Sequence, residues 1–147
     1  MKNQTVFALQ SQERQIGFTL LELLVVMVII GLLAGYVGPK YFAQIDKSKV
    51  KTAKAQIDSL GKALDQYKLD TGHYPSTENG LVSLYLAPAN EPKWHGPYLA
   101  KKVPADPWDK SYEYKMPGEY GDYDLWSFGS DATSGGKDDA ADVVSWE

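Results

Sequence analysis

The sequence predicts an α+β fold: a long N-terminal helix, half membrane-spanning and half amphipathic, packs on a small antiparallel sheet with an acidic loop at the C-terminus. Residues 18–37 are almost entirely apolar, which predicts a helix long enough to cross a membrane. Residues 50–67 repeat apolar side chains at helical spacing, and two Tyr-rich segments after residue 111 alternate like strands. A chain of 147 residues has room for one such domain plus appendages.

Composition narrows the functional classes. The absence of cysteine excludes disulfides, thiol nucleophiles and Cys-ligated metal sites. A net charge of −4 argues against a nucleic-acid-binding protein, and the only histidines, His73 and His95, are too far apart in sequence to suggest a catalytic pair. Residues 1–102 carry 12 basic and 8 acidic side chains (net +4), whereas residues 103–147 carry 3 and 11 (net −8). This asymmetry suits either self-association or a solvated acidic tail.

The apolar run contains one charge, Glu22, in 20 residues. At about 1.5 Å per residue it matches a bilayer core of about 30 Å. A secretory signal peptide is the main alternative, but its apolar region is usually shorter and is followed by an A-x-A-like site, which is missing here. A carboxylate in the apolar region costs about 2.5–3.5 kcal/mol, so Glu22 is expected to have a partner or to lie at the membrane surface.

The junction Gly17-Phe18-Thr19-Leu20-Leu21-Glu22, followed by an apolar helix, resembles the processing site of type IV pilins and pseudopilins. The resemblance implies that a prepilin peptidase removes residues 1–17 as a leader and methylates Phe18. It also implies that Glu22 of one subunit pairs with the Phe18 amine of a neighbour during assembly. Residues 18–38 would then form the transmembrane and filament-core helix, and residues 39–147 a periplasmic head.

The orientation of that helix involves a conflict. Five lysines lie shortly after the apolar run, at positions 40, 47, 49, 51 and 54, and only Lys2 and Arg14 precede it. The positive-inside rule therefore favours the opposite orientation. We give more weight to the processing motif, because the peptidase requires the leader in the cytoplasm.

An amphipathic helix follows the membrane segment. Val50, Ala53, Ile57, Leu60, Leu64 and Tyr67 are spaced 3-4-3-4-3, which predicts a stripe packed on the head. Gly72 is a suitable C-terminal cap, so the helix is expected to run to about residue 71. The glycines at 31, 35 and 38 and Pro39 predict a kink or a locally melted stretch near residues 35–39.

The head is expected to contain a short helix from Ser76 or Thr77 to Leu86, a Pro-rich loop over residues 87–110, and strands at 112–115 and 123–128. Alternation places Tyr123, Leu125 and Ser127 on one face of the second strand.

Motifs throughout the mature chain resemble the major pseudopilin of the type II secretion system, the general secretion pathway protein G family. They are Asp65-Gln66-Tyr67-Lys68-Leu69-Asp70, Tyr74-Pro75-Ser76-Thr77, Gly80-Leu81, Tyr98-Leu99, Pro104-x-Asp106-Pro107-Trp108 and Asp124-Leu125-x-Ser127-x-Gly129-x-Asp131. The resemblance implies a type IV pilin-like fold and a structural subunit rather than an enzyme.

The same resemblance implies a place and partners. The chain would be a single-pass protein of the bacterial inner membrane that forms a helical homopolymer in the periplasm and drives export of folded proteins across the outer membrane. Its partners would be minor pseudopilins, the prepilin peptidase and the inner-membrane assembly platform, with no nucleic acid. One alternative is a type IV or competence pilin for adhesion, motility or DNA uptake. A second is a membrane-anchored enzyme with an acidic metal site.

Residues 129–142 contain four aspartates and three glycines in 14 positions. Calcium takes about 6–8 oxygen ligands in flexible loops, but the spacing fits no EF-hand, so taken alone a solvated acidic loop is favoured. The family resemblance implies a calcium site here. It assigns the carboxylates of Asp131, Asp138 and Asp142 and the backbone carbonyls of Phe128 and Ser130 as ligands, and leaves Asp139 as a ligand or a solvated neighbour.

Overall fold

The computed structural model describes residues 17–147, so the predicted leader, apart from Gly17, lies outside the described residues. The chain divides into two compact units, Met1–Pro39 and Lys40–Glu147. Helix α1, Leu20–Thr71, contributes residues to both units, and every strand lies in the second. Each unit is described in turn.

In the first unit, α1 presents an apolar surface to its surroundings. The large apolar side chains from Leu20 to Val37 are exposed. The helix is long and apolar enough, by length and composition, to cross a membrane. The backbone stays helical through residues 35–39, so of the two predicted alternatives, a kink or a locally melted stretch, the structure excludes the melted stretch. Proline removes one hydrogen bond, but its φ near −65° is compatible with a helix, and helical residues continue on both sides.

In the second unit, the predicted apolar stripe of α1 forms one side of the core. Ala53, Ile57, Leu60, Leu64 and Tyr67 are all buried, which confirms the prediction. The helix ends at Thr71. Gly72 follows with φ +89°, and its N–H donates to the Lys68 carbonyl at 2.8 Å. This is the left-handed terminating residue expected of a glycine cap.

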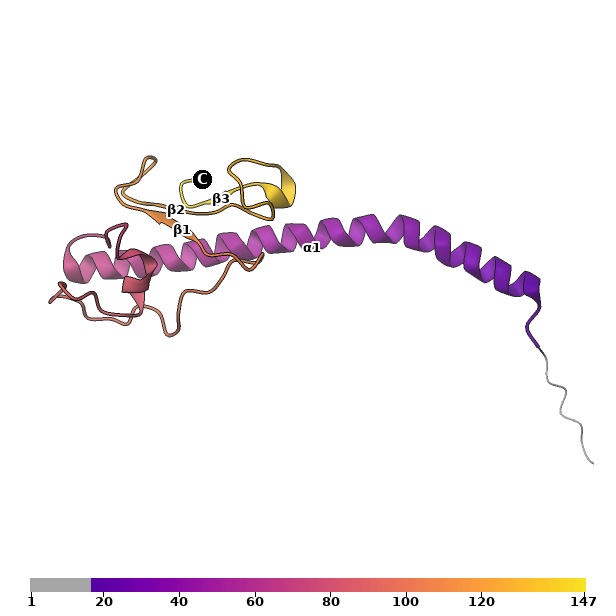
Figure 1. The fold of residues 1–147 in the computed structure, drawn as a ribbon, viewed down its shortest axis with the longest axis horizontal. Helices are drawn as coiled ribbons and strands as arrows, with labels where there is room; N and C mark the ends of the chain where they lie inside the picture. The colour runs from indigo at the N-terminus through magenta and orange to yellow at the C-terminus, as the bar shows by residue number, and fades with distance from the viewer. Residues whose placement is uncertain (1–16) are drawn as a thin grey trace, which may run out of the picture. The chain divides into compact units, whose positions relative to one another are not determined.

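The other side of the core is a three-stranded antiparallel sheet in the order β1-β2-β3 (Figure 1). Its strands are β1 (Glu113–Lys115), β2 (Asp124–Ser127) and β3 (Val143–Val144). Tyr114, Leu125 and Val143 are buried on the inner face. Trp126 lies on the outer face, in register with Glu113 and Val144. Two strands were predicted; β3 was not, because two residues are too short to show alternation.

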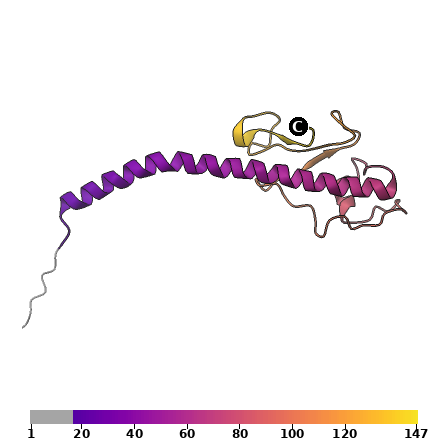
Figure 2. The ribbon, with the colours of Figure 1, turned by 180° about the vertical axis from the view of Figure 1, so that it is seen from behind.

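The segment between α1 and β1 packs along α1 and reaches the first strand of the sheet: Tyr114 of β1 donates its hydroxyl proton to the Pro75 carbonyl at 2.8 Å (Figures 1 and 2). It contains a 3₁₀ helix at Gly80–Leu84, shorter than the helix predicted from Ser76 or Thr77. Gly80 has φ +55°, a left-handed conformation that a continuous α-helix excludes. Tyrosine hydroxyls tie the segment to α1: Tyr74 donates to Asp65 at 2.8 Å and Tyr98 donates to Asp70 at 2.9 Å.

Candidate functional site: the N-terminal turn and the acidic loop

The N-terminal end of α1 is closed by a capping box. Gly17, Phe18 and Thr19 precede the helix in irregular backbone, and Phe18 is 81% exposed. The backbone N–H and the hydroxyl of Thr19 both donate to Glu22 Oε2, at 2.7 and 2.8 Å. The Glu22 N–H donates in return to the Thr19 hydroxyl at 3.2 Å. The Glu22 carboxylate is therefore held by Thr19, the residue after Phe18, in the first turn of α1, where a negative charge stabilises a helix.

The acidic loop, residues 129–142, begins at the end of β2 and is anchored there by a buried carboxylate. Asp106 Oδ1 accepts the N–H groups of Trp108 at 3.0 Å and of Lys110 at 2.8 Å. Asp106 Oδ2 accepts the Ser127 hydroxyl, and Ser127 Oγ accepts the Gly129 N–H at 3.2 Å. Asp106 and Ser127 are both buried. They join the two loops through side chains and fix the position of Gly129.

The predicted calcium ligands are spread along this loop. Asp131 is exposed, and its Oδ1 accepts the Thr133 N–H at 3.1 Å. Hydrogen bonding from Thr133 is the main reason that the pKa of Asp131 is lowered. Asp138 is exposed, has φ +56° and starts the 3₁₀ helix Asp138–Ala140. The side chain of Asp139 lies outside the described residues. Asp142, directly before β3, accepts the Gly135 N–H at 3.0 Å through Oδ2.

The donor chemistry of the loop fits a hard cation such as calcium. Its carboxylate and carbonyl oxygens are the ligands that calcium prefers. The second oxygen of Asp142, Oδ1, is buried and has no hydrogen-bond partner, and an unpaired buried carboxylate oxygen is costly unless something neutralises it. Among the side chains that the structure describes, no three acidic or histidine groups converge as a metal site would require. The assignment of Asp131, Asp138 and Asp142 as ligands therefore stays a prediction.

The two predicted carbonyl ligands lie in different surroundings. Ser130 offers its carbonyl to the ammonium of Lys110, at 2.9 Å. Phe128 places its ring against Trp126, with the ring centroids 5.9 Å apart. Lys110 was not among the predicted site residues. Asp106, whose carboxylate accepts the Lys110 backbone N–H, was not among them either. Asp106 and Ser127 lie in two of the quoted motifs, which is the only sequence signal that marks this junction.

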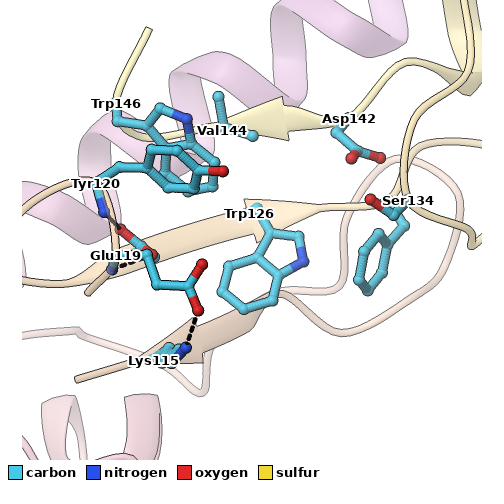
Figure 3. Close-up of a pocket in the computed structure, with 10 residues that line it drawn as sticks. Lys115, Glu119, Tyr120, Trp126, Ser134, Asp142, Val144 and Trp146 are labelled. Carbon is cyan, nitrogen blue, oxygen red and sulfur yellow. Dashed lines mark hydrogen bonds and ion pairs between the residues drawn. The ribbon is translucent and has the colours of Figure 1, made fainter. Parts of the chain in front are cut away.

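A shallow groove of about 410 Å³ lies on the outer face of the sheet beside the loop. Tyr120 and Trp146 stack at one end, with ring centroids 4.5 Å apart, and Ser134 and Asp142 lie at the other end (Figure 3). The ring of Trp126 lies between them. The carboxylate of Asp142 is thus at the edge of an open, partly aromatic surface.

Comparison with protein families identifies both ends of the chain. Residues 13–37 match the prokaryotic N-terminal methylation motif. Gly17, Phe18 and Glu22 lie within this matched range. Residues 40–146 match type II secretion system protein G. The first match covers the apolar half of α1 and the second covers nearly all of the second unit.

Individual relatives agree. Type II secretion system core protein G of Pseudomonas aeruginosa is 43% identical over 92% of this chain and 98% of its own length. The Vibrio cholerae protein of the same name is 40% identical over 94% and 96%. The crystal structure of the major pseudopilin from the type 2 secretion system of enterohaemorrhagic Escherichia coli superimposes with a TM-score of 0.60. It is 31% identical and covers 71% of this chain and 92% of its own.

These similarities support the secretion interpretation over the adhesion or competence pilin alternative, and the match to a structural subunit removes the enzyme alternative. They confirm the predicted pilin-like fold, with its long apolar N-terminal helix and small antiparallel sheet. An exposed apolar helix that starts at a methylation motif, joined to a head that matches protein G over nearly its whole length, places the chain in the type II secretion system protein G family of major pseudopilins.

Proposed function

We propose that the chain is cleaved between Gly17 and Phe18 and then polymerises in the periplasm to push folded proteins across the outer membrane. As a major pseudopilin it is a structural subunit of the pseudopilus, which it builds with other pseudopilins. The observation that carries the proposal is the exposed apolar surface of α1 next to the Thr19–Glu22 capping box. That surface needs a lipid or protein environment, and helices of other subunits supply one.

The proposal includes a location and two further partners. The apolar half of α1 anchors the precursor in the inner membrane, with residues 40–147 in the periplasm. A prepilin peptidase acts at the exposed segment from Gly17 to Thr19, and the inner-membrane assembly platform adds subunits to the filament. Irregular exposed backbone at the Gly17–Phe18 bond supports this, because peptidases bind extended rather than helical chain.

A deletion strain tests this function. Loss of the chain should leave exported enzymes in the periplasm, and the wild-type gene should restore their export. A variant with Gly17 replaced by Phe should remain uncleaved, should stay in the inner-membrane fraction and should fail to restore export. Normal export in the deletion strain together with loss of twitching or transformation would contradict the proposal and favour a pilin.

We further propose that the acidic loop binds calcium, with Asp131, Asp138 and Asp142 and the carbonyls of Phe128 and Ser130 as the ligands. Calcium would supply the charge that closes the loop in a protein without disulfides. The support is the oxygen-only donor set and the unpaired buried Oδ1 of Asp142.

Thermal unfolding of the full chain in detergent tests the calcium site. All four tryptophans (Trp94, Trp108, Trp126 and Trp146) lie in the second unit, so their fluorescence reports the head alone. Calcium at 100 times its Kd adds about 2.7 kcal/mol of stability, which is a rise of many degrees in a domain of this size. Magnesium should not replace it, and Asp142→Ala should abolish the rise. Equal melting curves in calcium and in chelator would contradict the site.

A further inference from the structure

One cation already lies at the entrance to the acidic loop: the side-chain ammonium of Lys110. It donates to the carbonyl of Ser130 at 2.9 Å and to the carbonyl of Gly129 at 3.3 Å. Both carbonyls belong to the first two residues of the loop. Lys110 itself is half-buried, so these bonds are shielded from water more than those of a surface lysine.

The backbone of Lys110 is held at both of its polar groups. Its N–H donates to Asp106 Oδ1 at 2.8 Å, and its carbonyl accepts the Asp106 N–H at 2.7 Å. The same Asp106 holds Ser127, which in turn holds the Gly129 N–H. One buried network therefore positions both partners of this contact. Asp106 holds the backbone of Lys110, and Ser127 holds the backbone of Gly129. A lysine fixed in this way loses less side-chain freedom on forming its hydrogen bonds than a lysine on a mobile loop.

The charge of Lys110 is complementary to the loop. Residues 129–142 carry four aspartates and one lysine, a net charge of −3. Asp131 directly follows Ser130, whose carbonyl accepts the hydrogen bond from Lys110. The positive charge of Lys110 is therefore opposite in sign to the net charge of the loop whose carbonyls it contacts.

We propose that Lys110 is a tethered cation of the acidic loop, which holds residues 129–131 in place without metal and competes with calcium for the Ser130 carbonyl. The tethering depends only on the hydrogen bonds described above, whereas the competition rests on the calcium site of the proposed function. A head built in this way keeps its loop partly ordered when calcium is scarce and binds calcium less tightly than the same loop would without the lysine.

Substitution of Lys110 by Met tests both parts, because Met keeps the aliphatic stem and removes the charge and the donors. Thermal unfolding of the full chain in detergent is followed by tryptophan fluorescence, first in chelator and then at increasing calcium concentrations. We expect Lys110→Met to lower the melting temperature in chelator by about 4–8 °C, the size expected for lost hydrogen bonds from a charged donor. We expect its calcium affinity to rise about threefold or more, and Lys110→Arg to behave like the wild type.

Lys137→Met is the matched control. It removes an equal charge at an exposed position within the acidic loop itself, so its effect on calcium affinity measures general electrostatics alone. Tethering is overturned if Lys110→Met and wild type melt together in chelator. Competition is overturned if Lys110→Met binds calcium no more tightly than Lys137→Met. If wild type gains no stability from calcium yet Lys110→Met melts lower in chelator, the calcium proposal fails and the tether stands.

Discussion

At the residue scale, two buried aspartates of the head each hold a loop by its backbone. Asp106 accepts two N–H groups from the loop that ends at Lys110. Asp124 accepts the N–H groups of Glu119 at 2.7 Å and Tyr120 at 3.2 Å. Both side chains are almost fully buried, so their cost of desolvation is offset by these charge-assisted bonds. They are structural groups, although a carboxylate cluster in a sequence easily suggests catalysis.

Replacing Asp106 by Ala should be strongly destabilising. The change removes the acceptor of two backbone N–H groups and of the Ser127 hydroxyl, and leaves these donors with reduced access to water. We expect a loss of about 2–4 kcal/mol in unfolding free energy, measured by denaturant titration with tryptophan fluorescence. Glu113→Gln, which removes an equal charge from an exposed position, should change stability by less than about 0.5 kcal/mol. Similar losses for both variants would show that Asp106 does not hold the loop.

Glu22→Gln separates helix capping from assembly. Glutamine still accepts hydrogen bonds from Thr19 but carries no charge for a neighbouring Phe18 amine. We expect normal membrane insertion. If the predicted pair with the Phe18 amine of a neighbour forms, we also expect at least a tenfold loss of pseudopili in sheared fractions, because losing such a pair costs more than about 1.4 kcal/mol, which is a factor of ten in an equilibrium constant. Thr19→Ala removes the cap, which costs about 1 kcal/mol of helix stability, and should weaken assembly less. Assembly that survives in Glu22→Gln but fails in Thr19→Ala would make capping the role of Glu22.

At the scale of elements, the acidic loop depends on one close backbone approach. Gly135 and Gly136 both have positive φ, +101° and +91°. A Cβ on Gly136 would lie 2.2 Å from the Ala140 carbonyl oxygen, whereas a Cβ on Gly135 would meet nothing within 4 Å. The two neighbouring glycines therefore differ in packing but share the same conformational demand.

Gly136→Ala should thus lower the melting temperature more than Gly135→Ala. Each alanine destabilises the fold by about 1–2 kcal/mol, because its backbone must adopt a left-handed conformation. Only Gly136→Ala must also displace the Ala140 carbonyl. The melting temperatures of the two variants in calcium, compared with wild type, measure the difference. Equal melting temperatures would mean that the loop does not close between these residues.

The elements also show how far sequence alone predicts this molecule. The buried stripe of α1 and its Gly72 end were predictable, because they follow from helical period and from the conformational freedom of glycine. Strand β3 was not, because it is defined by pairing with β2. The contact of Lys110 with Ser130 spans 20 residues with no periodic pattern, and it lies beside the tertiary contact of Asp106 with Ser127. The resemblance supplied the candidate ligands, and their convergence on a cation stays a prediction.

At the scale of the whole molecule, the two units have contrasting surfaces. Residues 18–39 contain a single charged side chain, Glu22, and expose their apolar ones. Residues 40–147 carry 13 basic and 17 acidic side chains around a core of their own. The first unit is suited to a membrane or to the interior of a filament, and the second to water. One continuous helix, α1, contributes residues to both units.

The head should therefore fold without the first unit. Among the described residues, the buried hydrophobic core runs from Ala53 to Val143, and Val50 packs against it as a partly buried residue. We expect a fragment of residues 40–147 to melt within about 2 °C of the full chain in detergent, which is less than about 0.5 kcal/mol for a domain of this size. A fragment of residues 58–147 serves as the control, because it lacks the buried Ala53 and Ile57. It should melt well below both the full chain and the 40–147 fragment, which would show that the assay detects the loss of core residues. A fragment 40–147 that melts like the shorter one would mean that the membrane half of α1 stabilises the head.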